Sequence, residues 1–364
     1  MKREIPAGYT MVGGILLALV ILMMIVTQPN LINLSKNTIF RTQKIREIFR
    51  LSGILARTDD GGFLNYYDNL IRRVDDSGRI VWQKDLAQKE LLWMGSKGFI
   101  TVGGGALTMW SAAGEQVFQK DIFIENPEIL CMEGDYILFS GKLQGKPYAA
   151  LMNTRGALIW QIPIAGRAIS GRTSTSGSYT VLNVLEEDLS SKLVFINSAG
   201  HLLWEIKQPV MTLCMEFVPG GVEAVAEDRV FKVDFQGSVV SKHVFENTVL
   251  RADVGKDGYI AAVVNQKQTK LASEQQANVI MLDPECCIKW SYAVDIPPVN
   301  IKKAGEFVHI IYGDKILALS REGILAYDLY CANAKGIEPV DDSRIIIKRD
   351  EDSSLMEIYG GSDL

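Results

Sequence analysis

Two adjacent cysteines, Cys286 and Cys287, are the residues of this chain best suited to chemistry. A cysteine thiolate is a nucleophile, and two neighbouring thiols can close a strained disulfide. Cys286 stands four residues before Trp290, at a position that glycine occupies in similar segments of the chain. We therefore interpret the pair as part of a turn. A reactive thiol or a local disulfide is the alternative.

Carboxylates and histidines form no catalytic or metal-binding pattern. The acidic runs 186–188 and 350–352 lie in segments that we expect to be solvated loops. His201, His243 and His309 have no second histidine and no cysteine at a zinc-ligand spacing. The sequence also contains no phosphate-binding loop and no nucleophile elbow. We therefore expect a protein that is not an enzyme, with no catalytic residues, no cofactor and no metal site.

A glycine followed four positions later by an aromatic residue recurs along the chain. Four clear pairs are Gly78 with Trp82, Gly114 with Phe118, Gly156 with Trp160, and Gly200 with Trp204. Weaker copies begin at Gly237, Cys286 and Gly323, and the last two of these end in Trp290 and Tyr327. Neighbouring copies are separated by 36, 42, 44, 37, 49 and 37 residues. A period near 40 made of turns and short strands is typical of a β-propeller, in which each repeat is one blade.

Each signature turn begins, in most copies, with an aspartate or asparagine that can accept hydrogen bonds from its own backbone. We assign turn roles to Gly78, Gly114, Gly156, Gly200, Gly237 and Gly323. A large aromatic side chain buries 150–250 Å² and can hold one blade against the next. We assign blade-docking roles to Trp82, Phe118, Trp160, Trp204, Trp290 and Tyr327. A stacking platform for a carbohydrate or a quinone is the alternative role for the tryptophans.

The Asp–x–x–Gly–x–x–x–Trp pattern resembles the PQQ-like repeat of quinoprotein-dehydrogenase-like propellers, over about residues 50–360. That superfamily holds quinone-dependent alcohol dehydrogenases and non-enzymatic scaffolds, such as the lipoprotein propeller of the outer-membrane barrel-assembly machinery. The dehydrogenases carry a disulfide between adjacent cysteines beside the quinone. Cys286 and Cys287 are expected at a blade rim, away from the ring axis, so the resemblance implies the fold and not the cofactor. The chain also resembles membrane-anchored propellers of Gram-positive bacteria.

Eight blades account best for the pattern. Seven signature turns are present, and residues 331–364 add about three further strands, near 336–340, 344–348 and 354–359. A closed ring needs a fourth strand for that last blade, and the segment 38–47 can supply it. We therefore predict an all-β, eight-bladed propeller over residues 38–364, closed by strands from both ends. A seven-bladed ring with a loose tail is the alternative.

The stretch from Tyr9 to Thr27 has no charged residue and is long enough to cross a bilayer as one helix. We predict a cytoplasmic tail at 1–8, a transmembrane helix at 9–27 and a linker at 28–37, with a cleaved signal peptide as the alternative. Lys2 and Arg3 precede the span and favour a propeller outside the cytoplasm. The expected location is the cell membrane, with a single pass.

The partner is the least specified property of the chain. A net charge of −5 without a basic run argues against nucleic acid. The longest spacing holds a polar insertion, and we consider Lys267, Lys270, Glu274 and Gln275 a candidate partner loop. We expect a non-enzymatic protein-interaction or assembly scaffold at the cell envelope. A sensor that binds a small ligand or glycan is the first alternative, and a PQQ-dependent oxidoreductase is the second.

Overall fold

The computed structural model describes residues 44–359, except 87–89, 123, 189, 267–275 and 342. All regular elements in this part of the chain are β-strands. None of its segments is a helix long and apolar enough to span a membrane. The predicted tail, transmembrane helix and linker at 1–8, 9–27 and 28–37 lie outside the described residues.

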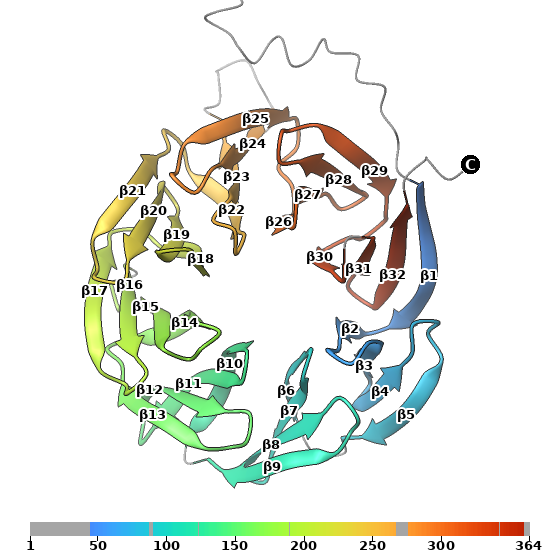
Figure 1. The fold of residues 1–364 in the computed structure, drawn as a ribbon, viewed down its shortest axis with the longest axis vertical. Helices are drawn as coiled ribbons and strands as arrows, with labels where there is room; N and C mark the ends of the chain where they lie inside the picture. The colour runs from blue at the N-terminus through green and yellow to red at the C-terminus, as the bar shows by residue number, and fades with distance from the viewer. Residues whose placement is uncertain are drawn as a thin grey trace, which may run out of the picture. The chain divides into compact units, whose positions relative to one another are not determined.

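The described strands form eight antiparallel sheets of four strands each, which we call blades 1 to 8 (Figure 1). Blade 1 consists of β2 (Ile54–Arg57), β3 (Phe63–Tyr67), β4 (Leu70–Val74) and β5 (Ile80–Asp85). Blade 2 consists of β6 (Glu90–Gly95), β7 (Gly98–Gly103), β8 (Ala106–Ser111) and β9 (Gln116–Asp121). Blade 3 consists of β10 (Glu125–Glu133), β11 (Tyr136–Leu143), β12 (Lys146–Asn153) and β13 (Leu158–Pro163). Blade 4 consists of β14 (Arg167–Thr173), β15 (Tyr179–Leu185), β16 (Ser191–Asn197) and β17 (Leu202–Gln208).

The second half of the ring repeats this plan. Blade 5 consists of β18 (Thr212–Val218), β19 (Gly221–Ala226), β20 (Arg229–Asp234) and β21 (Val239–Val244). Blade 6 consists of β22 (Val249–Val254), β23 (Ile260–Asn265), β24 (Ala277–Leu282) and β25 (Ile288–Val294). Blade 7 consists of β26 (Asn300–Ala304), β27 (Phe307–Ile311), β28 (Lys315–Ser320) and β29 (Leu325–Tyr330). Blade 8 combines β30 (Gly336–Pro339), β31 (Arg344–Lys348) and β32 (Asp352–Tyr359) with β1 (Lys44–Ser52).

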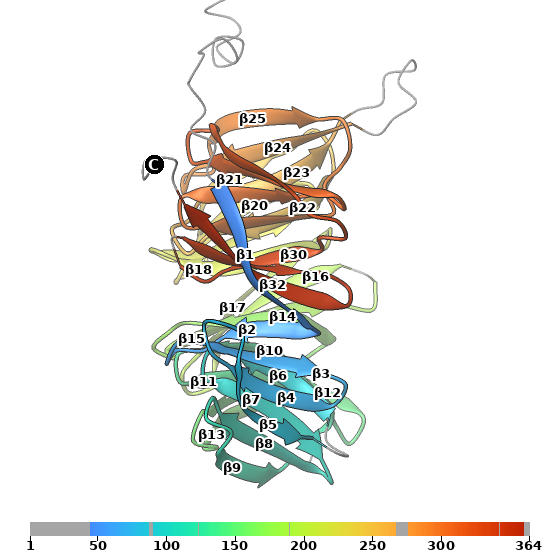
Figure 2. The same cartoon turned by 90° about the vertical axis from the view of Figure 1, so that its right-hand side faces the viewer.

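The blades close into a ring through their innermost strands, each of which contacts the innermost strand of a neighbouring blade, while β2 contacts β31 and β32 of blade 8. The eight-bladed prediction is confirmed. The strand that completes blade 8 spans 44–52, whereas the sequence pattern placed it within 38–47. β1 pairs antiparallel with β32, opposite Tyr359 at its start and Asp352 at its end (Figure 2).

Burial explains why the middle strands are so apolar. The second strand of blade 6, β23, is buried on both sides because it lies between two neighbouring blades. The outermost strand of blade 4, β17, instead alternates between exposed and partly buried residues. A sheet covered on both faces needs a continuous apolar run, whereas an edge needs apolar residues on one side only.

Antiparallel connectivity gives the ring two different faces. The turns between the first and second strands, and between the third and fourth strands, lie at one end of every blade. We call this end the signature face, because it carries the glycine turns. The connections between second and third strands, and from one blade to the next, lie at the other end, which we call the loop face. The start of β1 and the end of β32 both lie on the signature face (Figure 2).

Candidate functional site

The aromatic residues of the signature repeat lie on the outermost strands, against the turn of the next blade. A Cβ at Gly200 of blade 4 would lie 2.7 Å from Cβ of Trp160 of blade 3. Trp160 itself is 5% exposed and belongs to a core built from blades 3 and 4. The same contact joins further pairs: Trp82 with Gly114, Phe118 with Gly156, Trp204 with Gly237, and Trp290 with Gly323. That these contacts hold the blades together is a prediction tested below by substitution.

The turn glycines adopt a backbone conformation that side chains disfavour. Gly78, Gly114, Gly156, Gly200, Gly237 and Gly323 all have φ between +78° and +90°. At Gly200 the turn starts with Asn197, whose Oδ1 accepts hydrogen bonds from the backbone N–H of Ala199 and His201 at 3.0 and 2.9 Å. Glycine therefore serves two needs here, the left-handed φ and the close approach of the aromatic ring.

Indole N–H groups add hydrogen bonds between some blades. Trp204 Nε1 donates to the carbonyl of Phe235 at 3.3 Å, and Trp290 Nε1 donates to the carbonyl of Arg321 at 3.0 Å. Nε1 of Trp82 and Nε1 of Trp160 are buried without a hydrogen-bond partner among the described residues. The tryptophans therefore contact the next blade mainly through nonpolar packing.

The sequence analysis missed one aromatic residue of this series, Phe49 in β1. A Cβ at Gly78 would lie 2.8 Å from Cγ of Phe49, and the Phe49 ring packs edge-on against Phe63 with centroids 5.6 Å apart. Phe49 of blade 8 therefore contacts the signature turn of blade 1 in the same way that each tryptophan of the repeat contacts the turn of the following blade. Tyr327 of blade 7, 2% exposed, faces blade 8 without a turn glycine, because no turn joins β32 to β1.

The adjacent cysteines replace one glycine–aromatic contact. Cys286 has φ of +61° and is 2% exposed, and its Sγ lies 3.3 Å from Oγ of Ser241. Ser241 occupies the position that an aromatic residue fills in the other blades. The two exceptions therefore occur together: a small residue on blade 5 faces the only turn of the series with a side chain in place of glycine. Both cysteines are free thiols, and Cys287 is exposed.

We expect the exchange at Ser241 and Cys286 to be reciprocal. Ser241→Trp alone should lower the free energy of unfolding by about 1–3 kcal/mol, because the indole would overlap the Cys286 side chain. Adding Cys286→Gly should recover most of that loss, with a coupling energy of about 0.5–3 kcal/mol. Urea denaturation of the two single variants and the double variant measures the coupling, and additive effects would contradict the pairing.

His309 is buried, and the two acidic runs form ion pairs with neighbouring cations. His309 is 3% exposed, and burial lowers its pKa to about 4. In the run 186–188, the Glu186 carboxylate lies 2.8 Å from Lys207 Nζ and 3.4 Å from Lys192 Nζ. In the run 350–352, Asp352 pairs with Arg349 at 2.7 Å. Among residues 44–359 as described, no three acidic, cysteine or histidine side chains are placed to hold a metal ion.

Ion pairs line the innermost strands of blades 4 to 7. Arg172 Nε lies 3.1 Å from Glu216 Oε2, and Lys302 Nζ lies 3.1 Å from Asp253 Oδ1. Burial raises the pKa of Asp253, with Lys302 opposing the shift. Burial also raises the pKa of Cys131, on the innermost strand of blade 3, to about 12, so this thiol stays protonated.

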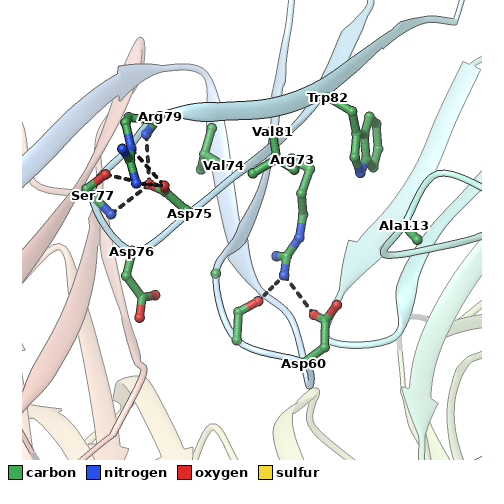
Figure 3. A pocket seen from close by; sticks show the side chains of 12 residues that line it. Asp60, Arg73, Val74, Asp75, Asp76, Ser77, Arg79, Val81, Trp82 and Ala113 are labelled. Atoms are coloured by element: carbon green, nitrogen blue, oxygen red, sulfur yellow. Dashed lines mark hydrogen bonds and ion pairs between the residues drawn. The ribbon is translucent and has the colours of Figure 1, made fainter.

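A hollow of about 650 Å³ lies on the signature face of blade 1, between its two turns and blade 2 (Figure 3). Arg73 reaches Asp60 at 2.8 Å and also bonds to the carbonyl of Gly61 and the hydroxyl of Thr58. The other acidic residues of this hollow are paired as well: Asp75 with Arg79 at 2.9 Å, and Asp76 with Arg344 at 3.5 Å. These charges neutralise one another, so they do not converge on a reacting atom.

The candidate partner loop, with Lys267, Lys270, Glu274 and Gln275, lies outside the described residues. Its flanks do pair, since the backbone N–H of Gln266 donates to the carbonyl of Gln276 at 2.9 Å. The insertion therefore leaves and re-enters blade 6 on the loop face.

Comparisons with known proteins support the fold. No family pattern and no curated protein matches the sequence. Among solved structures, BamB from Moraxella catarrhalis is similar with a TM-score of 0.59 and 10% identity, covering 86% of this chain and 100% of that one. The WD40 domain of SCAP from fission yeast is similar with a TM-score of 0.54 and 8% identity, covering 88% of this chain and 98% of that one. At these identities the likeness shows the propeller fold alone.

Proposed function

We propose that this protein is a membrane-tethered propeller that serves as a non-enzymatic protein-interaction scaffold at the cell envelope. The observation that carries the proposal is the difference between the two faces of the ring. The start of β1 and the end of β32 lie on the signature face, and no strand of the described part of the chain covers the loop face. A rigid ring with one face near its tether and the other directed away suits assembly of proteins at a membrane.

The tether comes from the sequence. Residues 9–27 are the predicted anchor, and the chain enters the ring at Lys44, opposite Tyr359, on the signature face. Because the chain enters the ring on the signature face, the loop face is the one we assign to a partner, and a charge bias at the anchor favours the outer side of the membrane.

The loop face offers apolar side chains to a partner. The exposed members, at or near the loop-face ends of innermost strands, are Ile54, Ile169, Met211, Ile296 and Val299, with exposed fractions of 51, 36, 37, 67 and 43%. The outer strands also expose apolar residues beside the signature turns, such as Leu202 and Leu203 at 54 and 45%, so the choice of the loop face rests on where the chain enters the ring. The Arg167–Glu128 ion pair, at 2.7 Å beside a hollow of about 440 Å³, adds charged groups to the loop face.

The rival function is quinone-dependent oxidation. That chemistry needs a Ca²⁺ site of oxygen ligands and a carboxylate base beside the quinone. The partly buried acidic residues along the innermost strands, Glu216 and Asp253, each pair with a cation. This pairing supports the scaffold, because a carboxylate engaged by a neighbouring cation has fewer oxygen lone pairs free to ligate Ca²⁺.

The full-length protein in its native membrane distinguishes these functions. We expect proximity labelling to enrich a defined set of proteins, and protease added to intact cells to cleave the ring. Supplying PQQ and Ca²⁺ should give no dye-linked oxidation of alcohols or sugars. Oxidation that requires both additions would overturn the scaffold proposal, and so would labelling no different from that of an unrelated membrane-anchored domain.

A further inference from the structure

Blade 5 carries a row made entirely of polar side chains, whereas the matching rows of the other blades are apolar or mixed. In antiparallel sheets, directly paired residues lie on the same side, so each outer aromatic heads a row of side chains facing the next blade. In blade 4 this row runs from Trp204 through Phe195 and Val181 to Arg172. In blade 5 the same row consists of Ser241, Lys232, Glu223 and Glu216. The seam between blades 5 and 6 therefore holds a row of polar groups beside an apolar core that both blades build, with Val225 and Val230 from blade 5 and Ile260 and Ile280 from blade 6.

Glu223 holds the most buried position of this row. The matching residues of the other blades are Leu64, Ile100, Leu138, Val181, Ala261, His309 and Ile346. The Glu223 side chain is fully buried, and neither carboxyl oxygen has a hydrogen-bond partner among the described residues. A buried ionised carboxylate without partners is costly, whereas a protonated one is tolerated.

The charged and titratable groups around Glu223 come from both blades. Within blade 5, Lys232 lies directly opposite it and attracts the ionised form, and Glu216 lies on its other side, paired with Arg172. From blade 6, the turns that cover the seam bring Asp257, Asp283, Glu285 and the Cys286 thiol. A Cβ at Gly258, in the first of these turns, would lie 3.4 Å from Glu223 Oε1. Three of these four groups are carboxylates that disfavour a charge on Glu223, and one of them, Asp257, is itself paired with Lys303 and Arg321 of blade 7 at 3.2 and 2.7 Å.

We propose that the seam between blades 5 and 6 is a pH-sensitive joint of the ring, closed while Glu223 carries its proton and loosened when that proton is lost. The seam lacks the contact between an outer-strand aromatic residue and the next blade's turn, so on the side of the polar row only the small Ser241 and Cys286 side chains meet there. The glutamate, the missing aromatic residue and the turn cysteine all fall on the same junction.

The direction of the pH dependence follows from the pKa values. Burial raises the pKa of Glu223 from 4.5 to about 8. Between these values the folded chain holds a proton that the unfolded chain has released, so stability falls as pH rises and levels off above about 8. Above that pH the folded ring itself carries a charged Glu223.

Thermal unfolding of the full chain between pH 5 and 9 tests the predicted fall in stability with rising pH. Relative to Glu223→Gln, the wild-type melting temperature should fall by about 5 °C between pH 5 and pH 8. Lys232→Gln removes the nearby cation, so its fall should extend to higher pH. Glu223→Leu, which matches the residue type of Leu64, keeps the test open if the glutamine variant does not fold. A wild type that tracks the glutamine or leucine variant at every pH would overturn the proposal.

The Cys286 thiol reports opening of this particular seam. In a Cys287→Ser background, maleimide labelling of Cys286 should be about tenfold faster at pH 9 than in the same background with Glu223→Gln. Comparison at one pH removes the pH dependence of the maleimide reaction itself. A charge on Glu223 raises the pKa of the Cys286 thiol and would by itself slow labelling, so faster labelling in the protein with Glu223 reports opening of the seam. Labelling of the buried Cys331, which lies beyond blade 7, is the control and should not differ between the two proteins. Equal rates at Cys286, or an equal rise at Cys331, would contradict a local joint.

Discussion

Trp160→Ala is expected to lower the free energy of unfolding by about 3–5 kcal/mol, the usual cost of removing a buried tryptophan. The indole is 5% exposed and packs beneath Gly200 of the next blade, so its loss opens a cavity between blades 3 and 4. Its Nε1 has no hydrogen-bond partner among the described residues, so the loss is one of packing. Urea denaturation measures this loss of stability, with unfolding monitored by far-ultraviolet circular dichroism because tryptophan fluorescence would itself change in the variant.

The chain contains its own matched control for this substitution. Ser241 holds the same position in blade 5 but fills little space, so Ser241→Ala should change the free energy of unfolding by less than about 1 kcal/mol. A small effect at Trp160, comparable to that at Ser241, would show that the aromatic contacts do not hold the blades together.

Removing β1 is expected to abolish the cooperative unfolding transition altogether. A chain that begins at Gly53 lacks the outer strand of blade 8, the pairing with β32 and the Phe49 contact on Gly78. It would expose the edge of β32, which promotes association between chains. Size-exclusion chromatography and thermal melting should show aggregated or non-cooperative material.

A chain that begins at Thr42 is the control, because it keeps all of β1. Phe49→Ala in the full chain separates the aromatic contact from the strand pairing, and should destabilise without abolishing the transition. A chain beginning at Gly53 that melts as sharply as the control would mean that the ring is closed without β1.

The glycine–aromatic spacing predicted the ring because it arises from local chemistry. An Asx turn needs Asp or Asn at its start and a residue that tolerates positive φ at its end, and both appear in the sequence. Asn197 and Gly200 show this combination in the structure. Because every repeat contains the same turn, the period near 40 residues remains recognisable even where a single copy matches the pattern poorly.

Contacts between segments that lie far apart in the sequence could not be predicted from local patterns in the same way. Phe49 has no signature turn beside it, because its strand pairs with β32 from the other end of the chain. Its role depends on register across the closure, which local pattern does not encode. The strand was therefore placed several residues too early.

The contact between Ser241 of blade 5 and Cys286 of blade 6 is a second feature that could not be predicted from the sequence. Cys286 was interpreted as an incidental turn residue, because its partner was not visible in the sequence. The structure sets it against Ser241, 45 positions earlier. In the sequence, Glu223 is a single polar residue within an apolar strand. Only the cross-strand register shows that its neighbours on the same face of the sheet, Lys232 and Glu216, are polar as well.

Site-specific photo-crosslinking in intact cells tests the scaffold proposal most directly. A photoreactive residue at Ile296, which is 67% exposed on the loop face, is compared with one at Arg155, exposed on a signature turn. We predict a discrete crosslinked protein from position 296 and none from position 155. Crosslinks of equal yield from both positions, or none from the loop face at Ile296, Val299 and Met211, would contradict the account.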